Sequence, residues 1–124
     1  MLKELDKRKI GFLELKESTE YYAYPNKFPT TQQEQIPDVC KAFRPLFSGI
    51  IIGNESFTPE TGIAKIRAGL CDAISFGRLY ISNPDLAQRM LNGWELSPIG
   101  DMNTFYGYKN GAKGYTDYPF YKQK

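Results

Sequence analysis

The sequence predicts an α/β fold whose strands run parallel. Two short apolar segments, residues 49–53 and residues 73–77, have the length and composition of buried strands. Residues 58–70 between them and residues 82–93 after them carry helix-start signals and apolar residues at helical spacing. Strands that alternate with helices in this way are most simply joined as a parallel sheet with crossover helices.

The N-terminal residues predict the end of a helix, a strand and a long loop. Leu2 and Leu5, separated by charged residues, indicate the last turns of an amphipathic helix. Residues 10–15 (IGFLEL) are short and mostly apolar, which suits a buried strand. Residues 18–35 contain paired tyrosines and two prolines and show no hydrophobic periodicity, so we expect a long loop. Loops of this length are usually functional or mobile.

A short helix and the strongest strand follow this loop. Pro37 is expected to open a helix through Phe43, and Pro45 ends it because the residue before a proline avoids the helical region. Residues 49–53 (GIIIG) are β-branched, uncharged and bounded by glycines. A strand that is apolar on both faces suits a parallel sheet that is covered on both sides.

The next helix start has a clear mechanism. Residues 58–60 (TPE) combine a hydroxyl that caps free amides, a proline suited to the first helical position and an acid suited to the positive end of the helix dipole. Ile63, Ile66 and Leu70 then recur at helical spacing on one face, which favours a helix over this segment.

The same signature begins the last helix. Residues 82–85 (SNPD) again offer caps, a proline and an acid, and we expect the helix to end at Gly93. Residues 94–124 are rich in Gly, Tyr and Pro, which predicts an ordered extension without regular structure. Its aromatic residues are suited to stacking on a flat ligand, although packing of the extension against the domain accounts better for most of them.

Composition excludes several classes of site. The 124 residues contain no histidine, which rules out Ser/His/Asp and Cys/His catalysis and histidine-ligated metal sites within this chain. Sixteen basic and fourteen acidic residues give a net charge of +2, which offers no general argument for binding nucleic acid or an anionic membrane. The acidic residues show no spacing typical of a metal site.

The cysteines and the hydropathy pattern indicate a cytoplasmic protein. Cys40 and Cys71 are too few for a disulfide scaffold or a four-ligand zinc site, so we expect free thiols in a reducing compartment. Cys71 is expected at a helix–strand junction as a small buried residue. The charged N-terminus lacks the apolar run of a signal peptide, and no stretch approaches the roughly 18 apolar residues of a membrane span.

Chemistry is expected where the two best strands end. The first strand leads into residues 53–56 (GNES), and the second leads into Gly77 and Arg78. In parallel α/β folds ligands gather at the carboxyl ends of strands, where free amides bind phosphate and an arginine clamps it. The pattern alone leaves open that these glycines only close tight strand ends and that Arg78 pairs with Asp85 or another acid.

Five segments resemble the old yellow enzyme family, whose members are FMN-dependent NAD(P)H oxidoreductases that reduce activated C=C bonds of enones. They are residues 73–86 (AISFGRLYISNPDL), 103–107 (NTFYG), 114–119 (GYTDYP), 57–61 (FTPET) and, more loosely, 43–47 (FRPLF). The resemblance implies strands six to eight of a (β/α)8 TIM barrel. It implies one partial-barrel domain over residues 1–124, with residues 1–93 in the barrel and residues 94–124 as a C-terminal extension.

The family resemblance also implies a site. The FMN phosphate is held by backbone amides after strand seven, at Glu55 and Ser56, and by Gly77 and Arg78 after strand eight. Where Glu55 stands the family commonly has glycine; a carboxylate there can point into solvent, since only the amide is needed. Phe105 and Tyr106 match aromatic residues that flank the flavin and the substrate pocket in the family, with Tyr106 on the substrate side.

The resemblance covers only the end of the barrel. The family's substrate carbonyl is held by a His-His or His-Asn pair on an earlier strand, and this chain has no histidine. Met1 falls inside a helix pattern, which indicates truncation. We therefore expect no catalytic residue here, inefficient hydride transfer by the chain alone, and a need for the N-terminal half or for self-association. The alternative is an inactive remnant that binds phosphate or associates with itself.

Overall fold

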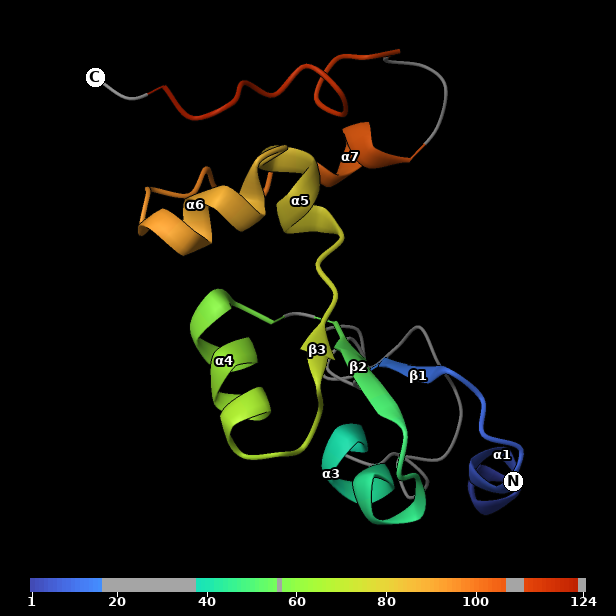
Figure 1. The fold of residues 1–124 in the computed structure, drawn as a ribbon. Coiled ribbons are helices and arrows are strands. Elements are labelled where there is room, and N and C mark those ends of the chain that lie inside the picture. The colour runs from blue at the N-terminus through green and yellow to red at the C-terminus, as the bar shows by residue number, and fades with distance from the viewer. Residues whose placement is uncertain (17–37, 56, 107–110, 123–124) are drawn as a thin grey trace. The chain divides into compact units, whose positions relative to one another are not determined.

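A computed structural model describes residues 1–16, 38–55, 57–106 and 111–122 (Figure 1). The chain divides into two compact units, Met1–Ser75 and Phe76–Lys124, and each has its own packing. The loop predicted over residues 18–35 and the proline at position 37 lie outside the described residues. No helix in the described parts of the chain is long and apolar enough to cross a membrane.

The first unit is built on a parallel sheet, as the sequence predicts. Its strands are β1 (Phe12–Lys16), β2 (Ile50–Asn54) and β3 (Ala73–Ile74), in the order β1-β2-β3. Leu13 pairs in register with Ile51. Strand β3 is shorter than predicted, because the chain leaves the sheet after its second residue.

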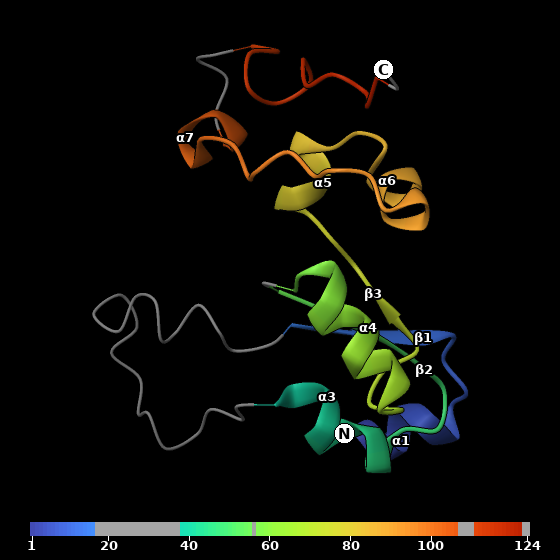
Figure 2. The same ribbon diagram turned by 90° about the vertical axis from the view of Figure 1, so that its left-hand side faces the viewer.

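Helices α1 (Leu2–Lys7), α3 (Val39–Phe43) and α4 (Pro59–Arg67), with the 3₁₀ turn η2 (Arg44–Leu46), complete this unit. Helix α3 packs on β1 and helix α4 on β3, and the two views in Figures 1 and 2 show α4 beside the strands. The predicted α3 ends at Phe43, and the chain tightens into a 3₁₀ turn that includes the proline at position 45. These elements surround one buried apolar cluster, which consists of Leu15, Cys40, Phe47, Ile51 and Cys71.

Helix α4 begins as predicted and packs on the sheet through a glycine. The Oγ1 of Thr58 accepts the Thr61 N–H at 3.3 Å, and the Thr61 Oγ1 accepts the Thr58 N–H at 2.9 Å. Ile63 and Ile66, which share one face of the helix, are 43% and 41% exposed. The helix instead approaches the sheet through Gly62, whose lack of a side chain allows close contact.

The described residues of the second unit form three short helices and irregular chain. They are α5 (Arg78–Ser82), α6 (Leu86–Asn92) and α7 (Met102–Phe105). Helix α6 ends at Gly93 as predicted, with a left-handed φ of 66° that glycine adopts without strain. The prediction that Ser82 or Asn83 caps α6 is wrong: Asp85 stands at the N-cap, and the other two side chains bind the extension that follows α6.

Candidate functional site

Glu55 follows β2 in an unusual backbone conformation. Its φ is 89°, in the region that favours glycine and that other residues rarely adopt. The family resemblance predicts glycine at this position, and the backbone here has the corresponding shape. Backbone strain of this kind is concentrated at turns and binding sites.

The Glu55 carboxylate does not point into solvent. The side chain is only 8% exposed, and its Oε2 lies 3.6 Å from the Nζ of Lys16. Lys16 ends β1, where it pairs in register with Asn54, the residue before Glu55. The acid is therefore turned toward the end of the neighbouring strand. Ser56, the other residue predicted for this half of the site, lies outside the described residues.

A row of polar side chains crosses the carboxyl ends of all three strands. The Ser75 hydroxyl donates to Glu14 Oε1 at 2.6 Å, and Asn54 Nδ2 donates to Ser75 Oγ at 2.6 Å and to Glu14 Oε1 at 3.4 Å. Sequence reasoning missed this row. The sequence signal that could have revealed it was one polar residue near the end of each predicted strand. These hydrogen bonds link the carboxyl ends of the three strands.

Gly77 and Arg78 begin helix α5 in the second unit. Gly77 is the N-cap residue, and its carbonyl accepts the N–H groups of Tyr80 and Ile81 at 2.9 and 3.1 Å. A Cβ added at Gly77 would meet no atom of the described chain within 4 Å. Open space beside Gly77 lets a ligand approach the backbone at the start of this helix, and the guanidinium of Arg78 is chemically suited to an anion such as phosphate.

The two predicted aromatic residues lie at the end of α7 and differ in exposure. Phe105 is 7% exposed and belongs to the packing of its unit, whereas Tyr106 is 75% exposed. Asp101 caps α7 by accepting the Asn103 N–H at 2.9 Å. Of the two residues, only Tyr106 is exposed.

Two other titratable groups singled out by the sequence have structural roles. Asp85, one alternative partner for Arg78, accepts from Arg89 Nε at 2.6 Å. Cys71 lies between α4 and β3 with 3% exposure, as predicted, and burial raises the pKa of its thiol. A thiol with a raised pKa is a poor nucleophile at neutral pH.

Known proteins similar to this chain share both sequence and fold. Flavin oxidoreductase hxnT of Emericella nidulans is 52% identical over 73 residues, which are 59% of this chain and 18% of hxnT. Putative 12-oxophytodienoate reductase 5 of Oryza sativa subsp. japonica is 40% identical over 88 residues, or 71% of this chain and 23% of the rice protein. No family model matches the sequence.

Solved structures match nearly the whole chain. The old yellow enzyme from Trypanosoma cruzi superposes with a TM-score of 0.77 at 30% identity, covering 98% of this chain and 28% of that enzyme. The old yellow enzyme homologue from Zymomonas mobilis gives 0.76 at 34% identity, covering 97% and 31%. The chain thus spans about a third or less of the length of these relatives. Agreement in sequence and in fold shows that the chain belongs to the old yellow enzyme family.

Proposed function

We propose that the chain is the C-terminal segment of an FMN-dependent NAD(P)H oxidoreductase that reduces activated C=C bonds of enones. The observation that carries this proposal is the 52% identity to a protein named flavin oxidoreductase. Rice relatives named 12-oxophytodienoate reductases support a conjugated ketone as substrate. In this proposal β1, β2 and β3 are strands six to eight of a (β/α)8 barrel, residues 1–124 form one partial-barrel domain, and residues 94–124 extend it.

The proposed role of the chain is to bind the FMN phosphate. Backbone amides of Glu55 and Ser56 and the Gly77–Arg78 pair supply the donors. The positive φ of Glu55 supports this role because it gives the strand end the turn that a glycine would make. The open space beside Gly77 lets a ligand approach the backbone, and Arg78 adds charge-assisted hydrogen bonds. Bound FMN would supply the hydride chemistry, which the side chains of this segment cannot perform.

On the substrate side, we assign Tyr106 to the wall of the pocket. Its exposed ring is available to a flat enone, whereas Phe105 is buried. The segment supplies no catalytic acid or base in this proposal, since the chain has no histidine. Alone it would therefore reduce enones far more slowly than its longer relatives, and full activity would need the remaining part of the barrel. The free thiols of Cys40 and Cys71 support a cytoplasmic location.

A second candidate function is self-association of an inactive remnant. Phe12 and Ile50 are register partners on the sheet, and their side chains are 57% and 52% exposed. Strands β1 and β3 are both outer strands of the sheet. Exposed apolar side chains beside open strand edges favour pairing with a second chain.

FMN titration of the purified chain tests the first proposal. We expect saturable quenching of flavin fluorescence, with riboflavin, which lacks the phosphate, binding more weakly. Arg78→Ala should weaken FMN binding about tenfold without changing riboflavin binding, because the lost bonds are charge-assisted. Gly77→Val should also bind FMN more weakly, and it should still fold, because a side chain at this position meets no other atom of the described chain. Arg67→Ala, on α4, is the matched charge control. Absence of saturable FMN binding by the wild-type chain overturns the proposed phosphate site.

Light scattering coupled to size exclusion tests the second candidate. A dimer mass that Phe12→Glu reduces to a monomer would support self-association through the sheet. Ile63→Glu is the control, since Ile63 has a similar exposure of 43% but lies on α4. A monomeric wild-type chain excludes this function.

A further inference from the structure

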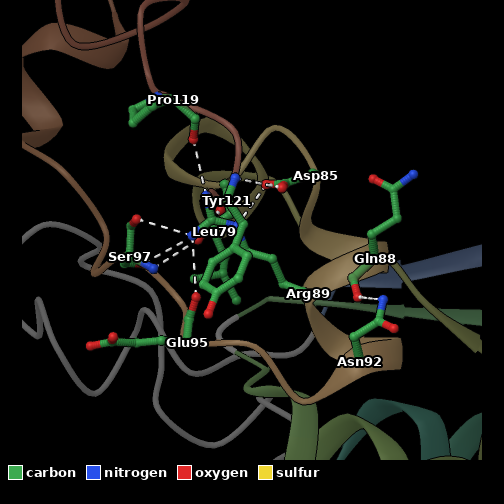
Figure 3. A network of polar contacts seen from close by, with 10 residues as sticks. Leu79, Asp85, Gln88, Arg89, Asn92, Glu95, Ser97, Pro119 and Tyr121 are labelled. Carbon is green, nitrogen blue, oxygen red and sulfur yellow. Dashed lines mark hydrogen bonds and ion pairs between the residues drawn. The ribbon is translucent and has the colours of Figure 1, made fainter. Parts of the chain in front are cut away.

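Helix α6 carries a buried ion pair one turn apart. Arg89 Nε donates to Asp85 Oδ1 at 2.6 Å, and each side chain is 4% exposed (Figure 3). Two charges withdrawn from water are costly unless hydrogen bonds satisfy their remaining donors and acceptors. The partners of these remaining atoms therefore show what the pair holds in place.

Those partners lie at both ends of the extension that follows α6. Arg89 Nη1 donates to the Glu95 carbonyl at 3.2 Å and to Ser97 Oγ at 3.3 Å, near the start of the extension. Arg89 Nη2 donates to the Pro119 carbonyl at 3.0 Å, and Asp85 Oδ2 accepts the Tyr121 N–H at 2.8 Å, near its end. Figure 3 shows the two ends meeting at this one ion pair.

Other contacts strengthen the same junction. Asn83 is fully buried; its Oδ1 accepts the Ser97 N–H at 2.8 Å and its Nδ2 donates to the Ser97 carbonyl at 3.0 Å. The rings of Trp94 and Tyr121 stack with centroids 4.6 Å apart, so an aromatic pair also joins the two ends. The Arg89 guanidinium lies 5.7 Å from the centre of the Tyr121 ring.

The extension between these anchors carries Phe105 and Tyr106. Its described residues form the short helix α7 and irregular turns, so it lacks the hydrogen-bond ladder that would hold a strand in position. One internal contact, from Thr104 Oγ1 to the Gly114 carbonyl at 2.9 Å, joins α7 to the returning chain. The position of Tyr106 relative to α6 thus depends on these end contacts, together with the Gly100 N–H that donates to Ser82 Oγ at 2.9 Å and the packing of the buried Phe105.

We propose that Arg89, oriented by Asp85, is a positioning residue that holds both ends of the extension and thereby places Tyr106. This inference rests on the proposed function insofar as it gives Tyr106 a substrate-side role. Arginine is suited to this task because its planar fork reaches several acceptors at once, which a lysine ammonium on a flexible stem does not do. Asp85 fixes that fork by binding its Nε.

Energy transfer between two sites of the second unit tests the proposal. Trp94 is the only tryptophan in the chain and serves as donor, and a Tyr106→Cys substitution carries a fluorescent acceptor. The native cysteines are buried, so we expect the label to react with position 106 under native conditions. In this background we compare Arg89→Lys and Asp85→Asn, which keep the size of each side chain, with Asn92→Ala, an exposed residue of the same helix whose Nδ2 donates to the Gln88 carbonyl at 2.8 Å.

We expect both variants of the pair to broaden the distribution of distances between Trp94 and the label at position 106, at temperatures where circular dichroism shows a folded chain. Asn92→Ala should leave this distribution unchanged. A purely structural role would lower the unfolding temperature and leave the distribution of the folded state as it is. That outcome in either folded variant overturns the proposal. FMN titration of Arg89→Lys should match the wild type, so a failure of the FMN site remains distinguishable from a failure of this inference.

Discussion

Lys16 and Glu55 form an ion pair across the ends of two neighbouring strands. The backbone of Glu55 has a positive φ, a conformation that is unfavourable for residues other than glycine. The Nζ–Oε2 distance is 3.6 Å, and the φ of Glu55 is 89°. Lys16 is 60% exposed, so solvent screens the attraction and the pair contributes little. The backbone cost at Glu55 is the larger of the two effects, because a side chain at positive φ costs roughly 1–2 kcal/mol.

Glu55→Gly should therefore be more stable than Glu55→Ala by about 1 kcal/mol, since both remove the ion pair and only glycine relieves the backbone. Urea unfolding followed by circular dichroism measures the difference. An alanine variant as stable as the glycine variant would show that the backbone is not strained here.

Thr58→Ala should lower the free energy of unfolding by about 1 kcal/mol, because it removes the hydroxyl that caps helix α4. Thr58→Ser keeps the hydroxyl and should behave like the wild type. Hydrogen exchange should locate the change in the first turn of α4, where the Thr61 N–H loses its acceptor. Equal protection of that amide in both variants would contradict the role of the cap.

The stability of the first unit should fall in acid partly through Asp72. Its Oδ2 accepts the Ile51 N–H and Arg44 Nη1, both at 2.8 Å. The Ile51 bond is the main reason that the pKa of Asp72 is lowered; Arg44 adds to it, and burial opposes it. Because the folded-state pKa is below the unfolded value of about 4, this stabilisation is present above that pH and is lost as pH falls through the folded pKa.

Unfolding free energies measured from neutral to acidic pH should thus decline less steeply for Asp72→Asn than for the wild type. At neutral pH the variant should be about 1 kcal/mol less stable. Glu95→Gln, which removes one charge at an exposed position in the second unit, serves as the charge control. Parallel curves for Asp72→Asn and the wild type would exclude this contribution.

Both thiols should react slowly in the folded protein. Cys40 is 0% and Cys71 3% exposed, and burial raises the pKa of Cys71, so access and thiolate formation are both reduced. A chromogenic disulfide reagent should modify both cysteines promptly in urea and much more slowly without it. Fast native reaction of either thiol would show that the cluster around Leu15 and Ile51 opens readily.

Elements specified by neighbouring residues were predictable. The capped start of α4 at Thr58, the left-handed end of α6 at Gly93 and the apolar strand β2 each depend on residues three or four positions apart, or on one β-branched run. The parallel arrangement also followed from the alternation of elements. Such signals act within a few residues, so they can be recognised without knowing what the chain packs against.

Contacts between distant segments were not predictable from local patterns. Ser75 donates a hydrogen bond to Glu14, 61 residues away in the sequence, and Arg89 donates one to Pro119, 30 residues away. The residues next to Ser75 and Arg89 in the sequence do not indicate these partners. The same reason explains the errors at Ser82 and Asn83, whose side chains suit a cap but bind the extension. For the candidate site, the motif around Gly77 and Arg78 was recognisable in the sequence, whereas the positive φ of Glu55 was seen only in the structure.

The sequence by itself determined the α/β class, the start of α4, the end of α6, and the family to which the chain belongs. Only the tertiary structure decided which faces are buried, where the carboxylate of Glu55 points, and that one ion pair on α6 ties both ends of the extension. The physical reason is the range of the interactions: caps and turns form among adjacent residues, whereas burial and ion pairing depend on which distant segments the fold brings together.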